Sequence, residues 1–237
     1  MQTEEVPLTF QIGMVGSDGV LLASDLKRVH EGLIGAITRF SSEQPKIHIF
    51  HSGLAYCCAG DEFAEVAARK FCEQADNLKD HPQIHSRLIE SGEYAIRERA
   101  SSRDHGMRQF ASILFAIRSA IGRFELWCLD LNWDDARGAM AEPVCGKRIN
   151  GDQANAAGFF VERYFRRGRP VQELTPLAAH TILVAHVLNT AGIDGLEIIR
   201  CTAEGCKKVS QDEIETLTER SRKLDAHIGA CMELQEP

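Results

Sequence analysis

Long apolar runs are missing from this sequence, and no segment approaches the roughly 20 consecutive apolar residues of a membrane-spanning helix. The first residues, MQTEEVP, are acidic and lack the basic and apolar parts of a signal peptide. Positive charge is in deficit, and the net charge of −7 disfavours nucleic acids and anionic membrane surfaces as main partners. We therefore expect a cytoplasmic protein that binds neither.

Metal, disulfide and phosphate-binding motifs are also missing. The eight cysteines include no C-x-x-C pair, and most of them lie in apolar segments, so we expect buried thiols in a reducing compartment. His81 and His85 have a zinc-like spacing, but Pro82 between them indicates the start of a helix. Gly16-x-x-Gly19 lacks the lysine and the helix of a phosphate loop. The sequence thus predicts no metal and no cofactor.

What the sequence does contain is a regular order of apolar hairpins and amphipathic helices. Nearly unbroken apolarity in 20–24 and 54–59 predicts strands that are covered on both faces. Ser210 and Glu213 form a capping box at the start of the last helix. The expected hairpins are 9–15 with 20–25, 46–51 with 54–59, 110–118 with 124–131, and 196–201 with 206–209, and the expected helices are 61–77, 83–103, 152–167, 175–190 and 210–234. This order predicts one α+β domain of two packed antiparallel sheets with helix pairs outside.

Four residues at the ends of the first four expected strands have the parts of a catalytic site. Thr9 opens the first strand, Asp25 closes the second, Lys46 opens the third and Gly60 ends the fourth. A hydroxyl beside a carboxylate and an amine can serve hydrolysis of an acyl bond. Each residue also has a structural interpretation: threonine favours strands, Asp25 can cap a strand end, and Lys46 can protect a sheet edge. The pattern as a whole favours a threonine hydrolase.

The spacing of these residues resembles that of proteasome β-type subunits and their bacterial relatives, members of the N-terminal-nucleophile hydrolases. Gly13 follows Thr9 by four positions, Asp25 follows Thr9 by sixteen, and Gly60 follows Lys46 by fourteen. Bacterial proteasome homologues, including the betaproteobacterial type, are the most similar branch. The resemblance implies a four-layer αββα sandwich, with residues 1–8 as a leader and 9–237 as the hydrolase domain.

The resemblance also implies a role for each residue. Once the leader is removed, Thr9 would supply both the attacking Oγ and an α-amine that acts as the general base. Lys46, held by Asp25, would stabilise charge at the Oγ, and the backbone N–H of Gly60 would face the oxyanion. Cys58 maps to a position that shapes the pocket for the substrate side chain.

The residues that support this site in relatives are altered here. A Gly-Ser-Gly stretch that supports the amine in many relatives corresponds to 149–152 (Ile-Asn-Gly-Asp). Asn150 would therefore take the hydrogen-bonding role of the serine. The aspartate expected near the end of a later helix corresponds to Leu188 or Asn189, and its serine partner corresponds to Ala191.

The resemblance implies a self-compartmentalising threonine endopeptidase that cleaves unfolded or short polypeptides. It would form homomeric stacked rings of twelve or fourteen subunits, with fourteen favoured, and a separate ATP-dependent unfoldase is an implied partner. Two alternatives stay open: an amidohydrolase of the same superfamily that acts on a small amide, and a non-catalytic chamber-forming scaffold. The scaffold is favoured by the altered supporting residues and by Leu8, which stands where self-processing relatives have glycine.

Overall fold

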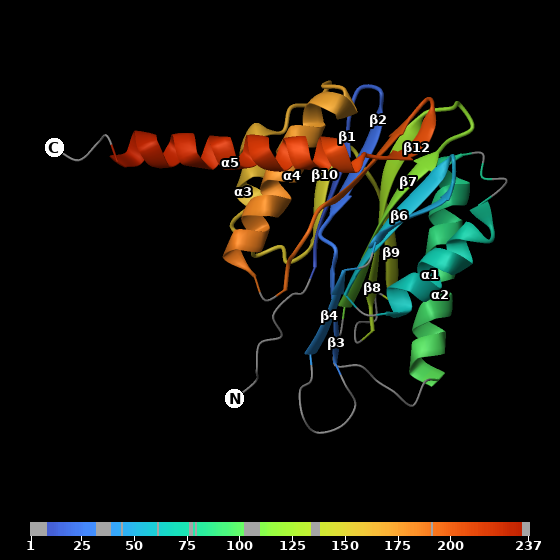
Figure 1. The fold of residues 1–237 in the computed structure, drawn as a ribbon. Coiled ribbons are helices and arrows are strands. Elements are labelled where there is room, and N and C mark those ends of the chain that lie inside the picture. The colour runs from blue at the N-terminus through green and yellow to red at the C-terminus, as the bar shows by residue number, and fades with distance from the viewer. Residues whose placement is uncertain are drawn as a thin grey trace.

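The computed structural model describes residues 9–31, 39–43, 45–60, 62–75, 78, 80–101, 110–133, 138–190 and 192–233. In this part of the chain, two five-stranded antiparallel sheets lie face to face, and helices cover both outer faces (Figure 1). The expected α+β sandwich with four αββα layers is therefore confirmed. The expected leader, 1–8, and Ala191 lie outside the described residues.

The first sheet has the strand order β10-β1-β2-β11-β12. All six residues of its central strand, β2, are buried, because helices cover one face of this sheet and the second sheet covers the other. The predicted burial of this segment on both faces is thus confirmed. The strands are β1 (Phe10–Val15), β2 (Gly19–Ser24), β10 (Lys147–Gly151), β11 (Glu197–Thr202) and β12 (Gly205–Lys208).

The second sheet has the order β5-β6-β7-β8-β9, and a separate two-stranded sheet pairs β3 with β4. The strands of the second sheet are β5 (Ile47–His51), β6 (Leu54–Gly60), β7 (Phe110–Arg118), β8 (Phe124–Asn132) and β9 (Ala139–Val144). The small sheet consists of β3 (Lys27–Glu31) and β4 (Arg39–Glu43), and it extends from one end of the sandwich (Figure 1).

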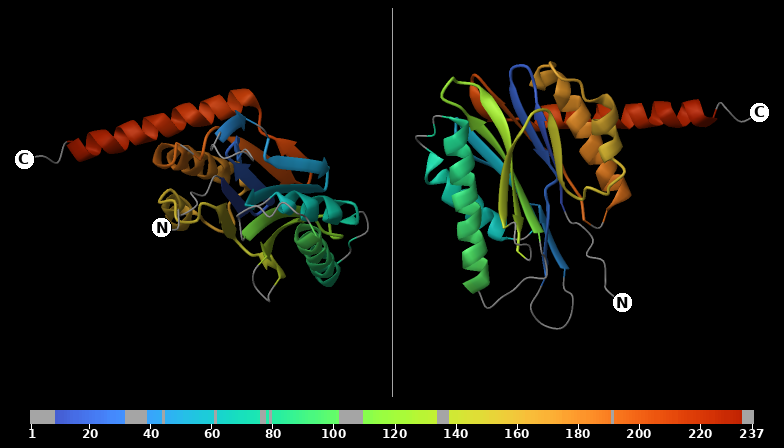
Figure 2. Two further views of the ribbon diagram at one scale, coloured as in Figure 1. Left: turned by 90° about the horizontal axis from the view of Figure 1, so that it is seen from below. Right: turned by 180° about the vertical axis from the view of Figure 1, so that it is seen from behind.

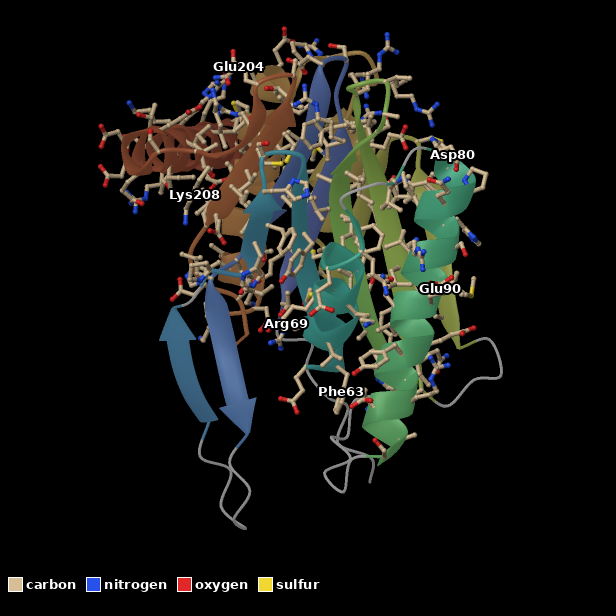
Figure 3. All side chains as sticks on the ribbon, turned by 90° about the vertical axis from the view of Figure 1, so that its right-hand side faces the viewer. Phe63, Arg69, Asp80, Glu90, Glu204 and Lys208 are labelled. Atoms are coloured by element: carbon tan, nitrogen blue, oxygen red, sulfur yellow. The ribbon has the colours of Figure 1, made fainter. Side chains whose placement is uncertain are left out.

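Two groups of helices form the outer layers, and their bounds are α1 (Phe63–Cys72), α2 (His81–Ser101), α3 (Gly158–Tyr164), α4 (Val171–Leu188) and α5 (Gln211–Glu233). Helices α1 and α2 cover the second sheet, and Figure 3, which labels residues of both, shows them side by side on this face. Helices α3 and α4, with the first part of α5, cover the first sheet (Figure 2). The rest of α5 projects beyond the sandwich (Figures 1 and 2).

Alternating residues of the strands serve different layers of the core. In β1, Phe10, Ile12 and Met14 pack against the helices that cover the first sheet. Because successive side chains in a strand point to opposite faces, Thr9 and Gln11 face the second sheet. The sandwich therefore directs the start of β1 into the space between the two sheets.

The sequence did not predict β3, β4, β9 or β10. These strands are polar or only partly covered: β9 reads AMAEPV and has no buried residue, and β10 reads KRING. They therefore lack the apolar pattern on which strand prediction relies. The expected helix 152–167 was wrong in its first part, because residues 152–157 form turns and the helix begins at Gly158.

Half of the expected capping box is present at the start of α5. The backbone N–H of Glu213 donates to the Ser210 Oγ at 3.3 Å. The Glu213 carboxylate instead pairs with the Arg200 guanidinium of β11, at 3.2 Å for one of its oxygens. An ion pair to the sheet thus replaces the local hydrogen bond of the box. Among the described residues, no helix is long and apolar enough to span a membrane.

Candidate active site

Thr9, Asp25 and Lys46 meet at one end of the two sheets, as the sequence predicted from their positions at strand ends. The Lys46 ammonium lies 3.1 Å from the Thr9 Oγ1 and 2.7 Å from the Asp25 Oδ2. Asp25 is 0% exposed and Lys46 is 5% exposed. A hydroxyl in contact with a buried, carboxylate-held ammonium has support for developing negative charge.

Asp25 is held by the backbone as well as by Lys46. Its two carboxylate oxygens accept hydrogen bonds from the N–H of Phe10 at 2.9 Å and of Lys27 at 3.1 Å. Burial raises the pKa of the Asp25 carboxyl, while the Lys46 charge and these hydrogen bonds act in the opposite direction. The carboxylate is therefore fixed in position on three sides, which fixes Lys46 beside Thr9.

A second buried carboxylate, which the sequence did not predict, holds the backbone around Lys46. The Glu197 Oε2 accepts hydrogen bonds from the N–H of Lys46 at 3.0 Å and of Ile47 at 3.1 Å. The Glu197 Oε1 lies 2.6 Å from the Lys208 ammonium. Glu197 belongs to β11 of the first sheet and Lys46 precedes β5 of the second, so this contact ties the two sheets together at the site. The only sequence signal was an acidic residue inside the apolar run LEII.

Gly60 ends β6 in a backbone conformation that requires glycine. Its φ is +97°, and a Cβ atom at this position would lie 2.4 Å from the Phe110 carbonyl oxygen. Cys58, two residues earlier, is half-buried and packs with the core between the second sheet and α1 and α2. Its carbonyl accepts a hydrogen bond from the Gln11 Nε2 at 2.7 Å. Both residues lie on the strand that faces the start of β1.

Asn150 lies deeper between the sheets than Thr9. It pairs with Gln11 in the ladder between β10 and β1, and it is 0% exposed. The Asn150 Oδ1 lies 3.4 Å from the Arg148 Nε, and Arg148 forms an ion pair with Asp130 of β8 at 2.8 Å. Among the described residues, the Asn150 Nδ2 and the Gln11 Oε1 make no hydrogen bond. Asn150 is therefore part of a buried polar row behind Thr9.

Asp152, not Asn150, is the residue whose backbone contacts Thr9. Its N–H donates to the Thr9 carbonyl at 2.8 Å. Its Oδ2 accepts hydrogen bonds from the Asn155 Nδ2 at 3.2 Å and the Asn189 Nδ2 at 3.3 Å. Asn189, one of the two positions expected to correspond to the family's aspartate, thus contacts the end of β10 through its amide. The acidic residue after Gly151 was the signal that could have revealed this contact.

The cysteines form no disulfide, and most are covered. Cys57, Cys72, Cys128 and Cys201 are buried, whereas Cys145 and Cys231 are exposed, so the expectation of buried thiols holds for part of the set. Burial raises the pKa of the Cys128 thiol to about 12. Such a thiol stays protonated at neutral pH and does not compete with Thr9 as a nucleophile. No group of three or more metal-ligating side chains occurs in the described part of the chain.

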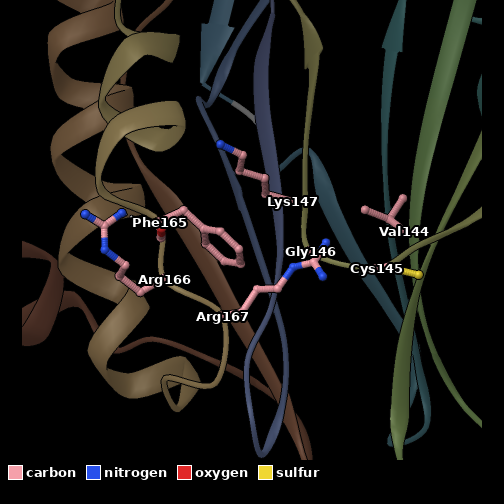
Figure 4. Close-up of a pocket in the computed structure, with 7 residues that line it drawn as sticks. All are labelled: Val144, Cys145, Gly146, Lys147, Phe165, Arg166 and Arg167. Carbon is pink, nitrogen blue, oxygen red and sulfur yellow. Dashed lines mark hydrogen bonds between the residues drawn. The ribbon is translucent and has the colours of Figure 1, made fainter.

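A cavity of about 490 Å³ lies elsewhere, between the β9–β10 turn and the segment after α3. Lys147, Arg166 and Arg167 line it, and none of the residues predicted for the Thr9 site does. Figure 4 shows the Lys147 and Arg166 side chains directed away from Arg167. Lys147 is paired with Glu162 at 2.6 Å. The cations therefore do not converge on one point.

Two solved structures have the same fold along almost the whole chain. One is Anbu (ancestral beta-subunit) from Yersinia bercovieri, with a TM-score of 0.70 and 13% identity over 96% of this chain and 98% of that one. The other is an Anbu (Gly-1) mutant from Hyphomicrobium sp. strain MC1, with a TM-score of 0.67 and 9% identity over 97% of this chain and 98% of that one. No family model and no curated protein matches the sequence.

The expected membership among proteasome β-type subunits, and the closeness to betaproteobacterial homologues, was wrong. The structural neighbours are Anbu proteins, which are proteasome-like but form a distinct family. The spacings of Thr9, Asp25, Lys46 and Gly60 follow from strand lengths in the sandwich. They therefore identify a proteasome-like fold and do not separate the families that share it.

Proposed function

We propose that this chain is a threonine endopeptidase subunit whose residues 1–8 are removed, so that the hydrolase domain 9–237 begins at Thr9. The observation that carries the proposal is the contact of the Lys46 ammonium with both the Thr9 Oγ1 at 3.1 Å and the Asp25 Oδ2 at 2.7 Å. A buried ammonium in this position favours attack by the oxygen over a purely structural role for the threonine. The similarity in fold to Anbu proteins supports the same proposal.

In the proposed reaction, the Thr9 Oγ attacks the carbonyl carbon of a peptide bond and passes its proton to the α-amine of Thr9. The π electrons move to the carbonyl oxygen, which the backbone N–H of Gly60 stabilises. Collapse of this intermediate breaks the C–N bond, and the ammonium returns the proton to the leaving amine. Water then hydrolyses the ester at Thr9 by the same steps. An α-amine suits this role because its unperturbed pKa is about 7.7 to 8.0.

The proposal extends to assembly and substrate. Homomeric stacked rings in the cytoplasm would enclose Thr9 in a chamber that only unfolded or short polypeptides enter, and a separate ATP-dependent unfoldase would supply folded substrates. Cys58, on the strand that ends at Gly60, would contribute to the pocket for the substrate side chain, and Asn150 would support the site from behind. Closed symmetry is the usual arrangement of homo-oligomers.

An α',β'-epoxyketone peptide tests the nucleophile and the amine together, because closing its ring consumes both the hydroxyl and an adjacent α-amine. We expect intact mass to show a chain that begins at Thr9 and one covalent adduct on that residue. Thr9→Ala should give no adduct while light scattering shows the same assembly. Peptide hydrolysis by a chain that still begins at Met1 would contradict the proposal.

A second candidate is a non-catalytic chamber-forming scaffold. It is favoured by Leu8 before Thr9 and by the altered supporting residues in 150–152 and 188–191. The same experiment separates the two functions. A chain beginning at Thr9 that gives no adduct and cleaves no unstructured peptide would make the scaffold the better assignment.

A further inference from the structure

Asp152 is fixed against Thr9 through the backbone. Its N–H donates to the Thr9 carbonyl at 2.8 Å, and its side chain is close to fully buried, with the residue 8% exposed. The preceding Gly151 has a φ of +83°, and a Cβ atom on it would lie 2.0 Å from the Thr9 carbonyl oxygen. The two segments of the backbone therefore approach as closely as glycine permits. The position of Asp152 relative to Thr9 is set by this contact.

The carboxylate of Asp152 has neutral partners only. Its hydrogen bonds come from the side-chain amides of Asn155 at 3.2 Å and Asn189 at 3.3 Å. In the part of the chain that the structure describes, no lysine, arginine or histidine contacts it. A nearly buried carboxylate without a cation is costly. This arrangement has a place for one positive charge beside Thr9.

The other charged groups at this end of the sandwich are already committed. Lys46 pairs with Asp25, and the Lys27 ammonium donates to the Thr190 carbonyl at 2.9 Å. In the last turn of α4, the His186 Nδ1 lies 2.6 Å from the Ile193 carbonyl oxygen and 3.6 Å from the Asp194 carboxylate. None of these side chains is directed to Asp152.

We propose that Asp152 is the positioning residue for the α-ammonium group that appears when the chain begins at Thr9. This inference rests on the proposed function. The α-amine becomes positively charged when it accepts the Oγ proton, and a nearby carboxylate favours that charged form. Asp152 would therefore raise the pKa of the Thr9 α-amine and make it a stronger base during attack.

The contact with Asn189 adds a prediction about where the charge resides. Asn189 directly follows α4, and its Nδ2 donates to the Asp152 Oδ2 at 3.3 Å, so the two side chains lie one hydrogen bond apart. Exchanging the two side chains should therefore place the negative charge on residue 189 and keep it near the amine.

The test uses the chain produced with Thr9 as its first residue, from a removable N-terminal fusion. The pKa of the α-amine is measured from the pH dependence of its acetylation rate, read by mass spectrometry. We expect Asp152→Asn to lower this pKa by about one unit, the smaller end of the effect of one nearby opposite charge. The double variant Asp152→Asn with Asn189→Asp should regain at least half of the loss. Asp194→Asn, which removes a half-exposed carboxylate, is the matched control and should leave the pKa unchanged.

An unchanged α-amine pKa in a folded Asp152→Asn protein would overturn the proposal, and so would a double variant that behaves as the single one. If Asp152→Asn does not fold, Asp152→Ser replaces it, with the same expected decrease. The measurement needs no turnover. If Asp152→Asn lowers the α-amine pKa but the wild-type chain cleaves no peptide, the peptidase is refuted and this inference stands.

Discussion

Two carboxylates flank Thr9, and their surroundings differ. Asp25 is completely buried, pairs with the Lys46 ammonium at 2.7 Å and accepts two backbone N–H bonds. Asp152 has slight exposure and two amide partners. The first site is complete in the chain as it folds, because its cation is a side chain. The second gains its cation only when the chain begins at Thr9, because the α-ammonium group of Thr9 then supplies the positive charge.

Removing Lys46 from its pair with Asp25 should have the largest effect on activity. Lys46→Ala removes the ammonium beside the Thr9 Oγ1 and leaves Asp25 buried without its cation, so we expect kcat/KM for an unstructured peptide to fall by about 10²- to 10³-fold. Lys46→Arg should not rescue activity, because a planar guanidinium does not replace a compact ammonium in a buried site.

The matched control for this change is Lys27→Ala. Its ammonium bonds the Thr190 carbonyl, while its backbone N–H, which the substitution keeps, still donates to Asp25. Activity of this variant should stay within about threefold of wild type, consistent with the small effects of surface substitutions. Equal losses in the two lysine variants would contradict the distinction between them.

A smaller loss of activity should follow from a substitution that displaces the Lys46 backbone and leaves Asp25 and Asp152 unchanged. Glu197→Gln replaces a buried, charged acceptor of two backbone bonds, and we expect a loss of about 1.5–3 kcal/mol in unfolding free energy, measured by urea denaturation. Activity should fall as well, because the backbone of Lys46 loses its anchor. Lys208→Ala, which removes only the half-exposed partner of Glu197, should cost about 1 kcal/mol or less.

The smallest effect concerns pH. Because burial raises the pKa of Asp25, its carboxyl should accept a proton at a higher pH than an exposed aspartate does. Acidification through that pKa removes the charge that holds Lys46, so activity should fall. The stability contribution has the opposite sign: the folded state binds this proton more tightly, and stability from Asp25 therefore decreases as the pH rises between the unfolded and folded pKa values. A carboxyl ¹³C titration, assigned with Asp25→Asn, measures the midpoint, and a value below that of a model aspartate would contradict the prediction.

The part of the site that the sequence predicted lies at the ends of apolar strands. Thr9, Asp25 and Lys46 flank segments whose burial fixes strand ends well, and adjacent strand ends meet in a sandwich. The strand ends allowed the three side chains to meet, and the family resemblance supplied the pairing of Lys46 with Asp25 beside Thr9. Gly60 followed in the same way, although its φ of +97° became visible only in the structure.

The residues that the sequence did not predict act across long separations in the chain. Glu197 bonds the backbone at Lys46, which is 151 positions away, and no local pattern records such a contact. Asp152 was assigned to a helix because β10 is short and polar. The sequence therefore did not predict its contact with Thr9. The edge strands β9 and β10 were missed for the same reason: β9 has no buried residue and β10 has one, so neither shows the apolar and polar alternation of a half-buried strand.

Helix α5 has a consequence for how the molecule would exchange its amide hydrogens with solvent. Its 23 residues span about 35 Å at the α-helical rise. Leu217 and Ser221 are buried, whereas Leu224 is 44% exposed and Ile228 is 37% exposed. In an isolated subunit, the first half would therefore share the protection of the core, while the second half would rely on helix propensity alone, which is marginal at this length. One continuous helix would then exchange at two rates, with the boundary close to Ser221.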